Sequence, residues 1–202
     1  MNRFDLLAKT WDEKPRRVEN AKKIGEAILK KIPLSPDWRV LDFGAGSGLL
    51  TFYLQPNVGW IDAVDNSKGM VEVLREKVQK AGVKNVNPIL GDIEDLDLGE
   101  ERYDLIVSSM TLHHIRDPKR LFEKLFKSLK RGGYIAIADL KKEYGTFHID
   151  NEGVYYFGFH REELERFLRE AGFEVVEISV VNVIRKNGRE YPVLLAIGRK
   201  PL

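Results

Sequence analysis

Apolar positions along this chain follow two alternating spacings, one typical of buried strands and the other of amphipathic helices. Short apolar runs predict strands, and helical spacing between them predicts helices. The predicted strands are Val40–Phe43, Gly59–Asp65, Val86–Leu90, Asp104–Ser109 and Tyr134–Ala138. The predicted helices are Pro15–Ile32, Ser67–Ala81, Asp117 to the glycine pair Gly132-Gly133, and Glu162–Ala171. This alternation predicts an α/β fold with a parallel, doubly wound sheet and right-handed crossovers.

The last part of the chain departs from this alternation. Two long apolar strands are predicted there, Phe173–Ile184 and Tyr191–Gly198, with Asn187-Gly188 between them. Asn-Gly between two strand runs is the strongest short-range signal for a β-hairpin. We therefore expect the last strand to run antiparallel to its neighbour.

A glycine-rich segment follows the first predicted strand, where Gly44, Gly46 and Gly48 precede an apolar helix start. Glycine suits a turn that needs positive φ or a close approach of a ligand, and the start of a helix offers unpaired N–H groups. A dinucleotide fingerprint would place its third glycine at position 49, where this chain has Leu49. Asp42, two residues before the first glycine, would repel a pyrophosphate but suits a ligand with an ammonium group.

The Asp-x-Gly-x-Gly-x-Gly pattern of residues 42–48 resembles motif I of the class I S-adenosylmethionine-dependent methyltransferases. Leu112–Ile115 resembles a segment of their UbiE-like, or methyltransferase type 11, branch. The resemblance implies a Rossmann-like, doubly wound sheet of seven strands, mostly parallel with an antiparallel last strand and helices on both faces. It also implies S-adenosyl-L-methionine as the cofactor and S-adenosyl-L-homocysteine as the product. We expect a single methyltransferase domain over residues 1–202, with an N-terminal helical cap at 1–38 and an α/β core at 39–202.

Cofactor residues are expected at the carboxyl ends of the strands, where ligands bind in open α/β sheets. A carboxylate at Asp65 can accept both ribose hydroxyls, and the resemblance implies that Asp92 accepts the adenine amino group. It further implies a backbone N–H at Ile93 for a ring nitrogen and a backbone carbonyl at Ser108 for the ammonium group. The alternatives are an ordinary strand-end residue for Asp65 and a loop residue for Asp92. The full predicted set is Asp42, Gly44, Gly46, Gly48, Asp65, Asn66, Asp92, Ile93 and Ser108.

Two adjacent histidines, His113 and His114, follow the fourth predicted strand. Histidine suits general-base chemistry because its pKa lies near neutrality, so both are candidate catalytic residues. Hydrogen-bonded packing is the alternative, since adjacent side chains are not expected to face one ligand together. We expect no metal site, because no third ligand has a suitable spacing nearby. His160 is interpreted as a helix-start residue, and the aromatic segment 141–158 as a candidate substrate wall.

Composition and charge limit the classes of partner. The 202 residues carry a formal net charge of +2, from 33 basic and 31 acidic side chains, so no long-range field gathers nucleic acid or anionic membrane. We expect a small-molecule acceptor, no nucleic acid and no membrane insertion, and we leave the oligomeric state open. The absence of cysteine excludes disulfides and thiolate chemistry and fits a cytoplasmic location.

Together with these patterns, the resemblance to the class I methyltransferases implies an enzyme that transfers a methyl group from S-adenosylmethionine to a small-molecule acceptor. An NAD-linked Rossmann oxidoreductase is the second hypothesis, and Leu49, Asp42 and the predicted hairpin count against it. A non-catalytic S-adenosylmethionine-binding accessory protein is the third hypothesis, because cofactor motifs alone do not prove turnover.

Overall fold

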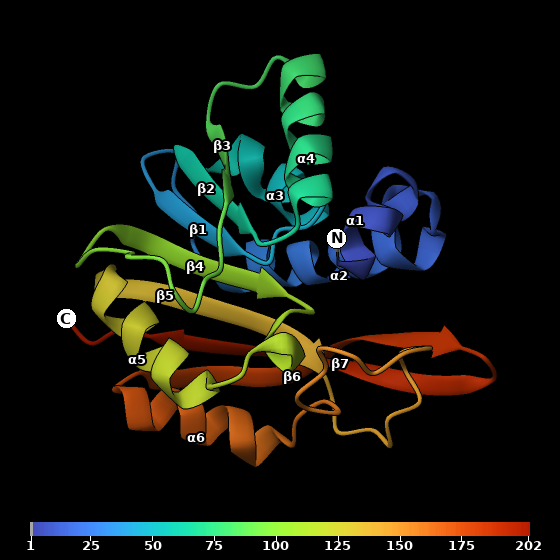
Figure 1. The fold of residues 1–202 in the computed structure, drawn as a ribbon. Helices are drawn as coiled ribbons and strands as arrows, with labels where there is room; N and C mark the ends of the chain where they lie inside the picture. Colours follow the sequence, from blue (N-terminus) through green and yellow to red (C-terminus); the bar gives the residue numbers. More distant parts are fainter. Residues whose placement is uncertain (1) are drawn as a thin grey trace. The chain divides into compact units, whose positions relative to one another are not determined.

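The computed structural model of this protein describes residues 2–202, which form two compact units divided between Asp97 and Leu98. Met1, the first residue of the predicted N-terminal cap, lies outside the described residues. Each unit combines β-strands with helices (Figure 1).

The first unit contains three parallel strands in the order β3-β2-β1. The strands are β1 Arg39–Phe43, β2 Trp60–Asp65 and β3 Val86–Leu90. The α-helices are α1 Arg3–Leu7, α2 Pro15–Lys31, α3 Leu49–Leu54 and α4 Lys68–Ala81, and the 3₁₀ helices are η1 Ala8–Glu13 and η2 Gln55–Asn57. Because the strands are parallel, their carboxyl ends share one edge of this sheet.

Helix α4 begins and ends where its sequence predicts. The hydroxyl of Ser67, the N-cap residue, accepts the N–H of Met70 at 3.2 Å. Gly82 follows the last helical residue with a φ of 65°, the left-handed conformation common after a helix. Leu74, on the apolar stripe between these caps, is buried.

The second unit contains four strands in the order β4-β5-β7-β6. The strands are β4 Tyr103–Ser109, β5 Leu129–Leu140, β6 Glu174–Lys186 and β7 Arg189–Arg199. The helices are the 3₁₀ helix η3 Leu112–His114, α5 Pro118–Ser128 and α6 Arg161–Ala171. Strands β4 and β5 are parallel, whereas β7 is antiparallel to both β5 and β6. Helices α5 and α6 pack side by side (Figure 1).

The turn between β6 and β7 is the hairpin predicted from the sequence. Asn187 and Gly188 have φ values of 52° and 73°, and a two-residue type I′ turn needs positive φ at both positions. The strand pairing closes directly on this turn, since Lys186 is paired with Arg189. The prediction of an antiparallel last strand is confirmed.

The boundary between α5 and β5 differs from the prediction. Helix α5 ends at Ser128 and β5 begins at Leu129, so the pair Gly132-Gly133 lies in a strand and does not end the helix. A Cβ on Gly133 would lie 2.9 Å from the carbonyl oxygen of Asp104 in β4. Glycine is therefore required there for the close approach of two backbones.

The predicted α/β fold class is confirmed by the seven strands of residues 2–202 and their mixed direction. Within the same residues, no helix combines the length and the apolar character needed to cross a membrane.

Candidate functional site

The glycine-rich turn joins the end of β1 to the start of α3. Gly44, Gly46 and Gly48 have φ values of 65°, 59° and 91°, which L side chains rarely adopt. The N–H of Ala45 donates to the carbonyl of Val64 at 2.9 Å and so holds the turn against β2. The tight turn is present in the structure, while its role in binding a cofactor stays a prediction.

Gly46 and Gly48 differ in what surrounds their missing side chains. A Cβ on Gly46 would meet no atom within 4 Å, whereas a Cβ on Gly48 would lie 2.4 Å from Cδ1 of Leu74. Gly48 therefore allows the turn to pack closely on α4. At Gly46 the space beside a left-handed backbone is open, which is the arrangement that a ligand-binding turn needs.

The carboxylate of Asp65, at the end of β2, connects the glycine turn to the start of α4. Its Oδ2 accepts the N–H of Gly46 at 2.8 Å, and its Oδ1 accepts the N–H of Ser67 at 2.8 Å. Burial raises the pKa of Asp65 above its ordinary value, although these N–H donors oppose the rise. Each carboxylate oxygen has a second lone pair, so Asp65 can brace the turn and still accept hydroxyl groups of a ligand.

Asp42 is almost fully buried near the end of β1. The hydroxyl of Thr51 in α3 donates to its Oδ2 at 2.6 Å. Burial raises the pKa of Asp42 to about 7, the Thr51 hydrogen bond opposes the rise, and the charge of Asp65 adds to it. The carboxyl group expected to face an ammonium ion therefore lies in the interior, hydrogen-bonded to a helix.

The other predicted cofactor residues lie at strand ends, as expected. Asp92, in the turn after β3, accepts the N–H of Glu94 at 2.9 Å, so it has the local role of a loop carboxylate. Ile93 is buried and Asn66 is exposed. Ser108 is buried in β4 of the second unit, paired with Ile137. Their roles toward a cofactor stay predictions.

The N-terminal segment contacts the turn through residues that the sequence analysis did not identify. Oδ1 of Asp5 accepts the hydroxyl of Ser67 at 2.6 Å and the N–H of Gly69 at 2.8 Å, at the start of α4. Asp12 accepts the hydroxyl of Ser47 at 2.5 Å and the ammonium of Lys77 at 2.7 Å. The segment 2–13 lacks a periodic apolar pattern, and these polar contacts connect it to α4 and to the glycine turn.

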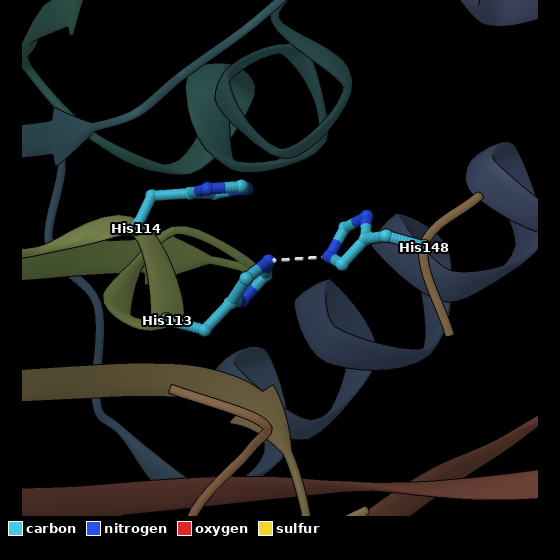
Figure 2. A group of neighbouring side chains, drawn as sticks. All are labelled: His113, His114 and His148. Atoms are coloured by element: carbon cyan, nitrogen blue, oxygen red, sulfur yellow. Dashed lines mark hydrogen bonds between the residues drawn. The ribbon is translucent and has the colours of Figure 1, made fainter. Parts of the chain in front are cut away.

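Three histidines meet in the second unit, and we call them the histidine cluster: His113, His114 and His148 (Figure 2). His113 and His114 belong to η3, whereas His148 lies in the segment 141–158. Nε2 of His148 is 2.9 Å from Nε2 of His113, and the ring centroids of His113 and His114 are 4.1 Å apart. His113 is buried, and the other two are partly exposed.

Asp139 in β5 orients the buried histidine of this cluster. Its Oδ1 lies 2.7 Å from Nδ1 of His113, and its Oδ2 accepts the backbone N–H of His113 at 2.9 Å. Burial acts to raise the pKa of Asp139, but the charge and hydrogen bonds of His113, together with the N–H of Leu140, outweigh it and hold the pKa below its ordinary value. Asp139 is therefore an ionised acceptor, and Nδ1 of His113 is its donor.

The structure contradicts the premises of two expectations about these histidines, while the expectations themselves, that the two do not face one ligand together and that no metal site is present, stay predictions. Adjacent side chains do converge, because the 3₁₀ turn of η3 brings the rings of His113 and His114 together. A third nitrogen ligand does lie nearby in space: His148 is 35 residues after His113 in the sequence, and its Nε2 lies 2.9 Å from Nε2 of His113. His160 is the N-cap residue of α6, and its N–H donates to the carboxylate of Glu163 at 2.8 Å, so its interpretation as a helix-start residue is confirmed.

The buried state of Asp42 predicts how stability depends on pH. A carboxyl group whose pKa is higher in the folded than in the unfolded state binds more protons when folded, so the free energy of unfolding falls as the pH rises from about 4 to about 7. Asp42→Asn removes this ionisation and keeps an acceptor for Thr51. The free energy of unfolding of the variant, relative to that of wild type, should therefore be higher at pH 8 than at pH 4 by on the order of a few kcal/mol. Urea denaturation at both pH values measures this difference. An equal difference at both pH values would contradict the burial of an ionisable group here.

The chain is similar to methyltransferases in sequence and in structure. Residues 41–137 match the family model Methyltransf_11, described as a methyltransferase domain. Over 116 residues the chain is 37% identical to an uncharacterized methyltransferase, C1347.09, of Schizosaccharomyces pombe, covering 54% of this chain and 41% of the relative. Over 156 residues it is 30% identical to an arsenite methyltransferase of Halobacterium salinarum, covering 72% of this chain and 40% of the relative.

The chain therefore spans about two fifths of the length of these two curated relatives. A solved structure is matched almost completely: a SAM-dependent methyltransferase from Aquifex aeolicus, with 30% identity and a TM-score of 0.74, covering 96% of this chain and 97% of the other. A relative matched over nearly its whole length at this identity establishes the family. The chain belongs to the class I S-adenosylmethionine-dependent methyltransferases, in the methyltransferase type 11 branch.

Proposed function

We propose that this chain binds S-adenosylmethionine at the glycine turn and transfers its methyl group to a small-molecule acceptor. The main support for the proposal is the open space at Gly46, where an added Cβ would meet no atom within 4 Å. The N–H of the same residue donates to the carboxylate of Asp65, which fixes the turn. The left-handed backbone leaves room for a ligand, and the strand-end carboxylate supplies acceptors for its hydroxyl groups.

In this proposal the residues of the first unit hold the cofactor in the roles predicted for them. Asp65 accepts the ribose hydroxyls, Asp92 accepts the adenine amino group, and Asn66 and Ile93 flank them. The bound cofactor supplies an electrophilic methyl group on a sulfonium. The protein then contributes mostly alignment and exclusion of water, because in-line attack disperses charge and needs no protein nucleophile.

A general base is needed only for an acceptor that holds its proton. His113 is the best candidate, because the carboxylate of Asp139 lies 2.7 Å from its Nδ1 and fixes the orientation of its ring. His114 is the second candidate. Its Nδ1 lies 2.9 Å from the carbonyl oxygen of Gly153, and that contact also fixes its ring.

A small molecule is the acceptor that the remaining observations favour. The near-neutral formal charge provides no field for nucleic acid, and the arsenite methyltransferase among the relatives is named for a small acceptor. The absence of cysteine fits the reducing cytoplasm, which we propose as the location.

Two alternative functions remain to be compared with this proposal. Leu49 and family membership count against an NAD-linked oxidoreductase. An accessory protein that binds the cofactor without turnover is distinguished from an enzyme by an activity measurement.

Gly46 and Gly48 provide a matched pair of variants for the binding turn. Gly46→Ala should weaken S-adenosylmethionine binding at least about 10-fold, because its Cβ enters the open space, while the left-handed φ costs about 1–2 kcal/mol of stability. Gly48→Ala should cost more stability, because its Cβ meets Leu74 at 2.4 Å. Calorimetric titration and thermal unfolding of both variants check this. Unchanged affinity in Gly46→Ala would remove the turn from the binding site.

Asp65→Ala tests the proposed ribose acceptor. Charged hydrogen bonds contribute about 1.5–3 kcal/mol each and water recovers part of the loss, so we expect affinity for S-adenosylmethionine and S-adenosylhomocysteine to fall by roughly 10- to 1000-fold. The affinity for S-adenosylhomocysteine should fall as much as that for S-adenosylmethionine, since the product keeps the ribose. Asp37→Ala, at an exposed loop position, is the control and should bind as wild type does. Calorimetry with both ligands and with NAD decides: tight NAD binding, or full affinity in Asp65→Ala, would overturn the assignment.

The proposed base is tested by His113→Ala and His114→Ala, made separately. A true general base should change turnover by roughly 100-fold or more and leave affinity for the cofactor nearly unchanged. Turnover is measured with an acceptor found by screening phenols, quinones and amines. His160→Asn, in which asparagine retains the ability to cap α6, is the control. Rates within a few-fold of wild type for both cluster variants would assign the two histidines to packing.

A further inference from the structure

The histidine cluster brings together three of the chain's four histidines. One ring nitrogen from each of His113, His114 and His148 lies within 4.8 Å of the other two. Figure 2 shows His113 and His114 on neighbouring positions of one turn, with the ring of His148 directed toward His113 from a separate segment. Imidazole is the commonest metal ligand among side chains, and three converging imidazoles match a known class of zinc site.

Contacts behind the rings determine which nitrogens face the cluster. Nδ1 of His113 donates to Asp139, so the lone pair of its imidazole lies on Nε2, the atom beside His148. Nδ1 of His114 lies 2.9 Å from the carbonyl oxygen of Gly153, which only accepts, so its lone pair also lies on Nε2. A carboxylate or a backbone carbonyl behind the ring is the usual support of a metal-ligating histidine.

The segment that carries His148 is fixed to the rest of the second unit. The N–H of Tyr155 donates to the carbonyl of His113 at 2.9 Å, and the hydroxyls of Thr146 and Tyr191 are 2.8 Å apart. The ammonium of Lys186 donates to the carbonyl of Phe147, next to His148. These bonds place the third imidazole before any ligand arrives, which reduces the entropy lost on binding.

The spacing of the ring nitrogens suits a first-row metal ion. Zinc–nitrogen bonds of about 2.0–2.1 Å in tetrahedral geometry set two ligand nitrogens about 3.3 Å apart. The pair in His113 and His148 is at 2.9 Å, and no pair in the cluster exceeds 4.8 Å. Small side-chain rotations therefore produce the bound geometry. A hydrogen bond accounts for the closeness of the His113 and His148 rings, and the shared 3₁₀ turn of η3 accounts for the closeness of His114 to His113.

We propose that His113, His114 and His148 form a binding site for a divalent transition-metal ion, with Zn²⁺ as the ion that the three imidazoles suit best. Asp139 is a positioning residue, because its carboxylate contacts Nδ1 of His113 at 2.7 Å and fixes the orientation of that ring. Because three protein ligands leave one tetrahedral position open and two of the histidines are partly exposed, the fourth position is accessible to water or to an acceptor heteroatom.

The metal site does not depend on the proposed function. It lies wholly in the second unit, and its ligands differ from the predicted cofactor residues. It does bear on the role of His113, because an imidazole that ligates a metal through Nε2 no longer accepts a proton there. Metal binding and cofactor binding are therefore measured separately on the same preparations.

The test is calorimetric titration of the full chain with Zn²⁺, after treatment with a chelator and dialysis. Wild type should bind one ion per chain with a dissociation constant on the order of 1 μM or lower. His148→Ala removes one ligand from a partly exposed loop position and should weaken binding at least about 100-fold, with its circular dichroism spectrum unchanged. His160→Asn, which alters the one histidine outside the cluster, should bind Zn²⁺ as wild type does. Co²⁺ added to wild type should give the visible absorption of a tetrahedral site, and His148→Ala should lose it.

Three results would overturn the metal site: no stoichiometric Zn²⁺ binding by wild type, undiminished binding by His148→Ala, or an equal loss in His160→Asn. Titration of the same preparations with S-adenosylmethionine separates the two proposals. Loss of Zn²⁺ binding in His148→Ala with full cofactor affinity supports both the metal site and its independence from the cofactor turn. Zn²⁺ binding by a wild-type chain that does not bind S-adenosylmethionine would overturn the proposed function and leave the metal site standing.

Discussion

The carboxylate of Asp65 is the contact on which the glycine turn depends. It accepts one N–H from the turn, at Gly46, and one from the start of α4, at Ser67, each at 2.8 Å. The three glycines of the turn have no side chains to hold it, so its backbone N–H groups need acceptors outside the turn, and these are Asp65 for Gly46 and the carbonyl of Val64 for Ala45. Burial of this acceptor carries a free-energy cost, and the two hydrogen bonds offset only part of it, because the pKa of Asp65 stays above its ordinary value.

The buried acids Asp42 and Asp139 differ in how far they ionise, and the difference follows from their partners. Asp42 has a single hydroxyl donor, from Thr51, and its pKa rises to about 7, so near neutrality it is ionised only in part. Asp139 faces an imidazole and two backbone N–H groups, and its pKa is held low. Desolvation acts on both in the same direction, so the difference comes from the number and charge of the donors and, for Asp42, also from the nearby charge of Asp65. The site at His113 therefore has a permanent negative charge behind it, whereas the end of β1 does not.

Local signals in the sequence were sufficient for most elements. Ser67 and Gly82 bound α4, and Asn187-Gly188 forms the hairpin turn, because caps and turns are encoded by residues within a few positions of one another. The pair Gly132-Gly133 predicts a helix end but lies in β5, since a glycine needed for close strand packing looks the same in the sequence as a glycine that ends a helix.

The parts of the sites that were missed are contacts between distant positions. Asp5 meets Ser67 across 62 positions, Asp12 meets Lys77 across 65, and His148 meets His113 across 35. The segments that carry Asp5, Asp12 and His148 have no periodic apolar pattern, so nothing in the sequence alone indicates which elements they approach. The sequence predicts the glycine turn because the residues of the turn are neighbours in the chain. It does not predict the histidine cluster, because the fold brings those residues together.

The most direct test of the central claim is an NMR titration of the amide groups of Gly44, Gly46 and Gly48. Our account predicts that S-adenosylhomocysteine shifts these amides saturably at one ligand per chain while NAD leaves them in place; adenosyl-ligand binding that leaves all three amides unmoved, or shifts produced by NAD alone, would contradict it.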